Sequence, residues 1–102
     1  MSEDDVLIGT LLSDGGLTLE QMAAACNVEA DWLLARLEAG LFPHAESVDG
    51  VWRFAEDAII RARRMHSLER DFDAVPELAA LVADLLEEMD RLRRRLHCLD
   101  AD

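Results

Sequence analysis

The sequence predicts an all-α protein that combines a helix-turn-helix, a small β-hairpin and one long C-terminal helix. Three observations predict this fold class. First, a helix-capping pattern is followed closely by an asparagine that suits a helix end. Second, an Asp49-Gly50 pair suits a hairpin turn. Third, the last quarter of the chain carries an unbroken apolar repeat. The 102 residues are about enough for one domain with a modest core.

Residues 1–16 are expected to form an N-terminal tail and a short lead-in strand. Residues 2–5 are polar and mostly acidic, which is typical of a solvated tail. The apolar run at residues 6–12 suits a short strand, although a helical lead-in fits the same run. The pair Gly15-Gly16 favours a turn directly after this run.

Two short helices are expected next, joined by a tight turn. Thr18 and Gln21 have the spacing of a capping box, which starts the first helix, and Asn27 suits its left-handed end. The second helix is predicted from Glu29 to Ala39, and Gly40 ends it. The residues expected to face the core are Leu19, Met22, Ala23 and Cys26 in the first helix and Leu33, Leu34 and Leu37 in the second.

A hairpin and a third helix complete the outline of a winged helix-turn-helix, which we assign to residues 17–72. Val51 to Phe54 reads as a short strand after the Asp49-Gly50 turn, with Trp52 expected in the core. The third helix is predicted over about residues 56–69, and residues 71–73 are expected to form the joint to the next element. Its core-facing side is predicted to hold Ile59, Ala62, Met65 and His66.

Residues 73–102 are predicted to form a coiled-coil-type dimerisation helix, with Pro76 in its first turn. Apolar residues follow each other at spacings of 3-4-3-4-3-4-3 from Val75 to Leu99, as in the a and d positions of a heptad repeat. Leu81 and Leu86 widen this stripe, so its first half is also expected to pack on the rest of the chain. A single helix packed only within its own chain is the alternative to a dimer. The predicted dimer interface is Leu78, Val82, Leu85, Met89, Leu92 and Leu96.

The charge of the chain is strongly acidic and unevenly distributed. The formal net charge is −12, and every basic residue is an arginine. Residues 1–57 carry twelve acids against two arginines, whereas residues 58–102 carry ten acids against eight arginines. A negative electrostatic field repels phosphate backbones and attracts basic protein surfaces. Solubility alone is an alternative explanation for the excess of acids. In the last helix, acids precede arginines, so two antiparallel copies would place acids opposite arginines.

The sequence gives little support for an enzyme, and we expect no catalytic, cofactor-binding or metal-binding residues. His44, His66 and His97 are isolated from one another, and neither Cys26 nor Cys98 has a partner at a metal-ligand spacing. No carboxylate pair stands out as an acid and base. Two distant cysteines, with neither a membrane-length apolar run nor a secretion signal, favour a reducing cytoplasmic setting.

The chain resembles the CbpM family of chaperone modulators from about residue 17 to residue 96. The resemblance lies in the order and spacing of the segments LTLEQMAAACNVEADWLLARLEAGLF, GVWRF, RARRMHSLERDF and VPELAALVADLLEEMDRLRRRL. It implies a fold similar to that of the MerR regulators, which are winged-helix dimers with a long dimerising helix. It also implies a partner, the J-domain of a CbpA-like co-chaperone. By binding there, the protein would block two activities of the co-chaperone, its stimulation of DnaK and its DNA binding.

The start of the second helix departs from that of a DNA-reading MerR regulator. Those regulators carry basic and hydroxyl residues there, whereas this chain reads Glu29-Ala30-Asp31-Trp32. Carboxylates at that place would face phosphates, so we expect a protein partner and no nucleic acid. Trp32 would be an aromatic anchor if exposed and a packing residue if buried. The predicted partner-binding residues are Glu29, Asp31, Trp32, Glu69, Asp71 and Asp73.

Two other functions remain open on the sequence alone. A degenerate MerR-like regulator could place the arginines of the third helix (Arg61, Arg63, Arg64 and Arg70) on phosphates. We favour the view that they neutralise the acidic surface. A structural dimerisation module, without regulatory output, is the third hypothesis.

Overall fold

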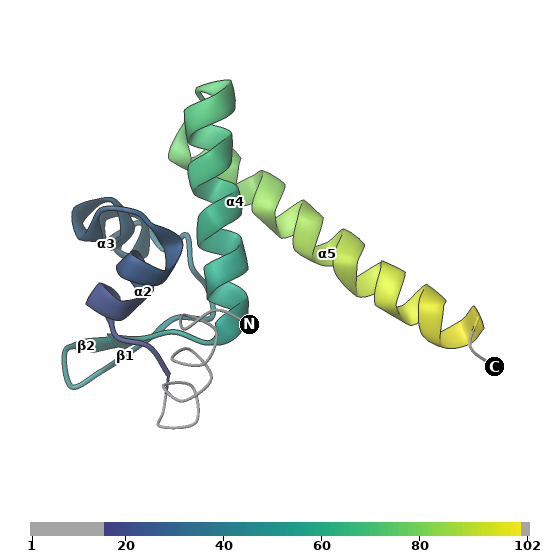
Figure 1. Cartoon of the computed structure of the whole chain (residues 1–102), viewed down its shortest axis with the longest axis horizontal. Helices are drawn as coiled ribbons and strands as arrows, with labels where there is room; N and C mark the ends of the chain where they lie inside the picture. The colour runs from purple at the N-terminus through teal and green to yellow at the C-terminus, as the bar shows by residue number, and fades with distance from the viewer. Residues whose placement is uncertain (1–15, 101–102) are drawn as a thin grey trace.

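The structure is a computed structural model, which describes residues 16–100. The tail and the lead-in strand expected at residues 1–15 therefore lie outside the described residues. The elements are α2 (Leu19–Cys26), α3 (Ala30–Glu38), β1 (Glu46–Val48), β2 (Val51–Arg53), α4 (Glu56–Phe72) and α5 (Pro76–Asp100). Helices α2 and α3 and the hairpin lie to one side of α4, and α5 projects away as an arm (Figure 1). This mostly helical fold with a small hairpin confirms the predicted fold class.

The start of the helix-turn-helix forms as predicted. The Thr18 hydroxyl accepts from the Gln21 N–H at 3.3 Å, and the Gln21 carboxamide oxygen accepts from the Thr18 N–H at 2.9 Å. Asn27 ends α2 in the left-handed conformation, with φ 57°. Helix α3 is one residue shorter than predicted at each end, because Glu29 is its N-cap and Ala39 its C-cap. Its buried residues are Leu33 and Leu37, whereas Leu34 is half-buried.

The wing is a two-stranded antiparallel hairpin, in which Val48 pairs with Val51. Asp49 and Gly50 have φ values of 52° and 76°, and two successive left-handed residues form the turn that suits a twisted hairpin. Beyond the strands, Leu17 and Phe54 exchange two backbone hydrogen bonds of 3.2 Å. Gly16 permits this contact, since a Cβ there would lie 2.7 Å from the Phe54 carbonyl oxygen.

The core lies where α2, α3 and the hairpin meet α4. Its largest fully buried side chains are Phe54, Leu17, Met22, Leu33 and Met65. Trp52, expected in the core, is half-buried and packs against its edge, and His66 is also half-buried. The predicted core face of α4 is confirmed for Ile59, Ala62 and Met65.

Helix α4 continues past its predicted end. Asp71 and Phe72, which were expected in the joint, are still helical. The helix closes at Asp73, which adopts the left-handed conformation with φ 54°, so the change of direction occurs at residues 73–75. Helix α5 begins at Pro76, so this proline lies in its first turn, as predicted.

The first half of α5 packs on α4, as expected, but through alanines, and Leu81 does not take part. Ala79, Ala80 and Ala83 are the buried residues of α5, whereas Leu81 is 54% exposed. Alanines allow the two helix backbones to approach closely, which leaves the larger side chains on the outside. No helix within residues 16–100 combines the length and the apolar character needed to cross a membrane.

Candidate functional site

Two of the predicted partner-binding residues, Trp32 and Glu69, meet where α3 crosses the end of α4. The Trp32 indole N–H donates to the Glu69 carboxylate at 3.2 Å. Arg36 donates to both oxygens of the same carboxylate, at 2.5 and 3.2 Å, and its guanidinium lies 4.4 Å from the centre of the Trp32 ring. His66 meets that ring edge-on, with centroids 5.3 Å apart. We call Trp32, Arg36, His66 and Glu69 the Trp32 cluster.

The Trp32 cluster faces inward. Trp32 is half-buried, and the side chains of Arg36 and Glu69 are each only 15% exposed. Because Arg36 neutralises Glu69 with a two-point contact, this carboxylate has little charge left for a partner. The alternative in which Trp32 packs the helices describes its position better than a freely exposed anchor does.

The other four predicted partner-binding residues are exposed, in two groups. Glu29 and Asp31 lie at the start of α3 and form no ion pair with any residue that the structure describes. At the end of α4, Arg70 and Ser67 donate hydrogen bonds to Asp71, and these bonds lower the pKa of its carboxyl group. Asp73, the C-cap of α4, forms no ion pair within residues 16–100.

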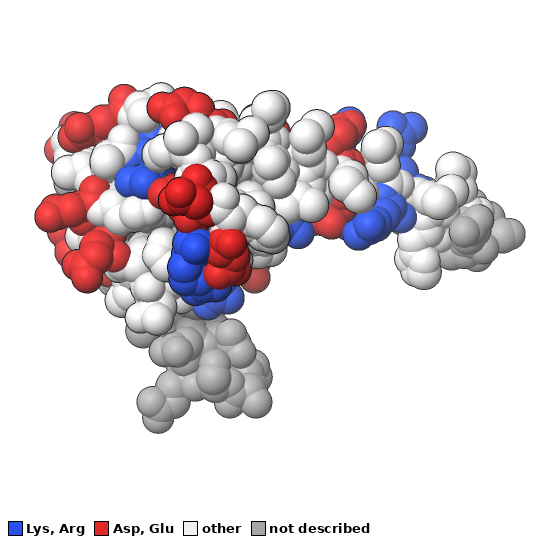
Figure 2. All heavy atoms as spheres, turned by 90° about the horizontal axis from the view of Figure 1, so that it is seen from above, with Lys and Arg blue, Asp and Glu red and all other residues white. Residues whose placement is uncertain are grey.

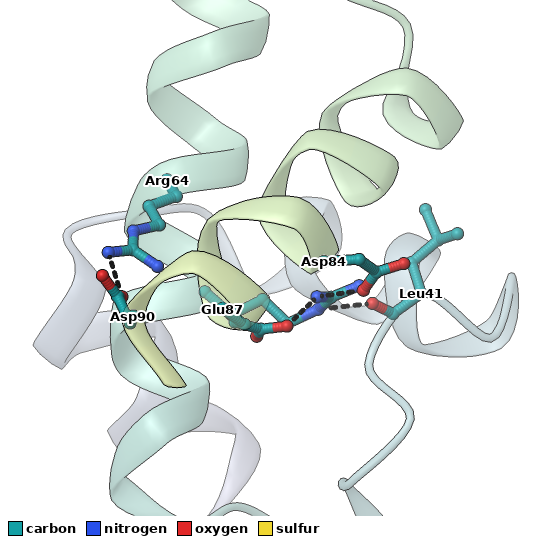
Figure 3. Close-up of polar contacts among 6 residues, drawn as sticks. Leu41, Arg64, Asp84, Glu87 and Asp90 are labelled. Carbon is teal, nitrogen blue, oxygen red and sulfur yellow. Dashed lines mark hydrogen bonds and ion pairs between the residues drawn. The ribbon is translucent and has the colours of Figure 1, made fainter. Parts of the chain in front are cut away.

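Arg61 is the buried charged residue of the part of the chain that the structure describes, at 4% exposure. It donates to the Asp84 and Glu87 carboxylates of α5 at 2.7 and 2.9 Å and to the Leu41 carbonyl at 2.9 Å (Figure 3). Its guanidinium also lies 5.8 Å from the centre of the Phe42 ring. Arg61 thus joins the loop after α3, helix α4 and helix α5, which the sequence did not indicate.

The remaining arginines of α4 are also engaged within the chain. Arg64 donates to Asp90 at 2.8 Å (Figure 3), and Arg70 pairs with Asp71. Arg63 donates to the carbonyl of Ala25, so its guanidinium has no carboxylate partner within the described residues. The interpretation of these arginines as partners for acids is therefore confirmed for Arg61, Arg64 and Arg70.

The charges left without an ion pair are segregated along the molecule. Arg53 and Arg63 are the unpaired bases of the described helix-turn-helix part, and Arg93, Arg94 and Arg95 are those of α5. Acidic side chains lie along the left and upper edge of the globular part, and arginines gather along α5 toward its free end, beyond acids of the same helix (Figure 2). The exposed, unpaired acids of residues 16–57 are Glu20, Glu29, Asp31, Glu38, Glu46, Asp49, Glu56 and Asp57.

The predicted dimer-interface residues form an exposed apolar stripe along α5. Leu85, Leu92 and Leu96 are 57%, 50% and 61% exposed, and only Val82 is half-buried. We call Leu78, Val82, Leu85, Met89, Leu92 and Leu96 the α5 stripe. A contiguous apolar surface of this length on a projecting helix is unusual for a helix that remains alone in water.

The two cysteines differ in burial, and most carboxylates of the groove beside α5 are already paired. Burial raises the pKa of the Cys26 thiol to about 11, against a smaller lowering by Arg63, so the thiolate form is scarce. Cys98 is exposed. A groove of about 390 Å³ lies between α4 and α5, but most of its carboxylates already pair with arginines. Within residues 16–100, no three His, Cys, Asp or Glu side chains are grouped so that they could hold a metal.

Comparison with known proteins places this geometry in a family. The family model described as MerR HTH family regulatory protein matches residues 17–101. The chain is 27% identical over 77 residues to the chaperone modulatory protein CbpM of Pseudomonas entomophila (strain L48), which covers 76% of each chain. No solved structure matches the chain. The resemblance stated from the sequence is thus confirmed, and the chain belongs to the MerR HTH family of regulatory proteins.

Proposed function

We propose that this protein is a non-enzymatic chaperone modulator, an adaptor that binds the J-domain of a CbpA-like co-chaperone in the cytoplasm. In binding, it would inhibit both the stimulation of DnaK and the DNA binding of that co-chaperone. The similarity to a chaperone modulatory protein supports the role, and the resemblance to the CbpM family supplies the partner. J-domains present a basic second helix to DnaK, so a binder that covers this helix would compete with DnaK directly.

One observation carries the proposal: the exposed surface of the helix-turn-helix has the sign of charge that a basic helix needs. Glu29 and Asp31 are exposed and have no ion pair among the described residues; they lie at the start of α3, where a DNA-binding MerR regulator carries basic residues. Asp73 adds an unpaired carboxylate at the end of α4. Most of the α4 arginines that could offset this charge already form ion pairs within the chain.

We further propose that the protein acts as a homodimer held by the α5 stripe. Its residues recur at the a and d spacing, and on an isolated chain they would remain largely in water. Exposed ion pairs between two such helices would each stabilise the dimer by under about 1 kcal/mol. They would therefore decide the relative orientation of the helices more than the stability of the dimer.

Titration of the protein with a purified J-domain of CbpA type, at low and at high salt, tests the adaptor role. We expect binding that weakens as salt rises, because charges at an interface rim are screened over about 8–10 Å. The double substitution Glu29→Lys with Asp31→Lys should weaken it by about tenfold, or about 1.4 kcal/mol. Glu20→Lys with Glu38→Lys makes the same charge change elsewhere on the exposed surface and serves as the matched control. A wild-type protein that does not bind the J-domain would refute the proposal.

A DNA-binding regulator is the second candidate, because the matched family consists of helix-turn-helix regulatory proteins. Arg53 in the hairpin and Arg63 on α4 are exposed and have no carboxylate partner in the described structure. They could reach phosphates. A gel-shift measurement at low salt separates the two functions, since tight and sequence-dependent DNA binding would favour the regulator over the adaptor.

A further inference from the structure

The end of α4 carries an aromatic side chain that neither the core nor the Trp32 cluster uses. Phe72 is 75% exposed, the highest value among the large hydrophobic residues of the described chain. Val75, directly after the helix end, is 59% exposed. Glu69, one turn before Phe72, accepts the indole N–H of Trp32, which directly follows Asp31 at the start of α3, so this apolar pair lies at the end of α4 that meets α3.

Trp32 is poorly placed to be the aromatic anchor of that surface. Arg36 stacks over its ring, His66 meets its edge and Glu69 accepts its N–H. A partner could reach the full indole only by breaking these contacts. Phe72 requires no such rearrangement, and a side chain that is exposed in the free protein gains the most when a partner removes it from water.

The charges around Phe72 favour a cationic occupant. Asp71 and Asp73 lie at the C-terminal end of the 17-residue α4, where the helix dipole is negative and carboxylates are unfavourable for the helix itself. Arg70 offsets Asp71, but Asp73 and the exposed Glu77 have no ion pair in the described structure. An apolar side chain among carboxylates fits a helix that presents both basic and apolar residues.

We propose that Phe72 is the aromatic anchor of the partner-binding surface, an inference that rests on the proposed function. Val75 adds apolar contact area beside it, and Asp73 supplies negative charge. The occupant is the cationic helix of the J-domain, whose apolar side chains would cover Phe72. Buried aromatic residues near the middle of an interface are typical of the few positions that dominate binding energy. Trp32 then has a structural role, in which it connects α3 to α4.

The substitution Phe72→Ala tests this assignment in the full-length protein with a purified CbpA-type J-domain. Because the side chain is exposed, the melting temperature should stay within about 3 °C of wild type, whereas J-domain affinity falls by about tenfold or more. Ile60→Ala removes a 50% exposed side chain from the same helix and is the matched control, with affinity expected within about twofold of wild type. Trp32→Phe, which keeps an aromatic ring beneath Arg36, should also retain affinity within about twofold.

Four results would overturn the inference. Wild-type affinity in Phe72→Ala, or a larger loss in Trp32→Phe than in Phe72→Ala, would remove Phe72 from the anchor position. A drop in the mass of Phe72→Ala from dimer to monomer in light scattering would mean that a second copy covers Phe72. If the wild-type protein itself does not bind the J-domain, the proposed function fails and this inference fails with it. Binding by wild type but not by Phe72→Ala supports both.

Discussion

Arg61 of α4 donates a 2.7 Å hydrogen bond to the carboxylate of Asp84 on α5, across a separation of 23 residues in the sequence. The arginine is buried, whereas the Asp84 side chain is 55% exposed. A buried guanidinium therefore reaches outward to solvated carboxylates, which lessens the cost of taking its charge out of water. This contact fixes the first half of α5 against α4 and leaves its second half to project as an arm.

Arg61→Met should lower the free energy of unfolding by about 2 kcal/mol. The substitution keeps the apolar stem but leaves the Leu41 carbonyl without its donor. The loss is expected to be smaller than for a fully buried pair, because Asp84 and Glu87 can turn to water. Urea unfolding at one protein concentration measures it. Arg93→Met, at an exposed arginine of α5 without an ion pair, is the control, and an equal loss there would contradict the role of Arg61.

Asp90→Asn should make the protein less sensitive to acid. The hydrogen bond from Arg64, and then its positive charge, lower the pKa of the Asp90 carboxyl group below its ordinary value. Since the folded pKa lies below the unfolded one, the contribution to stability is present above about pH 4 and is lost as the pH falls through the lowered value. Unfolding free energies measured from pH 6 down to 3 should therefore fall less steeply in Asp90→Asn. Ser47→Ala, at an exposed residue without an ionisable side chain, should keep the wild-type slope.

Leu85→Asp combined with Leu92→Asp should convert the proposed dimer into a monomer. Both side chains are at least half exposed in the single chain, so the fold should survive. A dimer would bury the two new charges of each chain between the α5 helices, which is unfavourable. Light scattering after gel filtration gives the mass, and circular dichroism checks the helix content. His97→Asp adds a charge at an exposed position outside the α5 stripe and should leave the mass unchanged. A double variant that stays dimeric would place the interface elsewhere.

The two α5 helices of the proposed dimer should run antiparallel, because this orientation sets the acids of one copy against the arginines of the other. Cys98 allows a direct measurement, since it is exposed while the Cys26 thiol is buried and has a pKa raised to about 11. Cys98 lies about ten residues from the centre of the stripe, or about 15 Å along the helix. Spin labels on Cys98 should thus lie about 30 Å apart in an antiparallel dimer. A separation near one helix diameter, about 10–12 Å, would indicate a parallel pair.

The features that were predicted well depend on residues close together in the sequence. The capping box of Thr18 and Gln21, the left-handed Asn27 and the Asp49-Gly50 turn all form as expected. Each is decided by backbone conformation and by hydrogen bonds within a few residues, so the residue types and their spacing suffice. The end of α4 was misplaced because nothing in the local pattern distinguishes a helical Asp71-Phe72 from a joint.

The sequence by itself determined the order of the elements, the apolar repeat of α5 and the excess of acids, because each of these follows from local residue patterns and composition. Only the tertiary structure decided that Ala79, Ala80 and Ala83 meet α4, that Glu69 is held by Arg36 and Trp32, and that Phe72 remains in water. A periodic pattern assigns residues to a face, but it does not say which neighbouring helix that face will meet. That choice depends on which side chains let two helices approach most closely and on which charges then lie within hydrogen-bond distance.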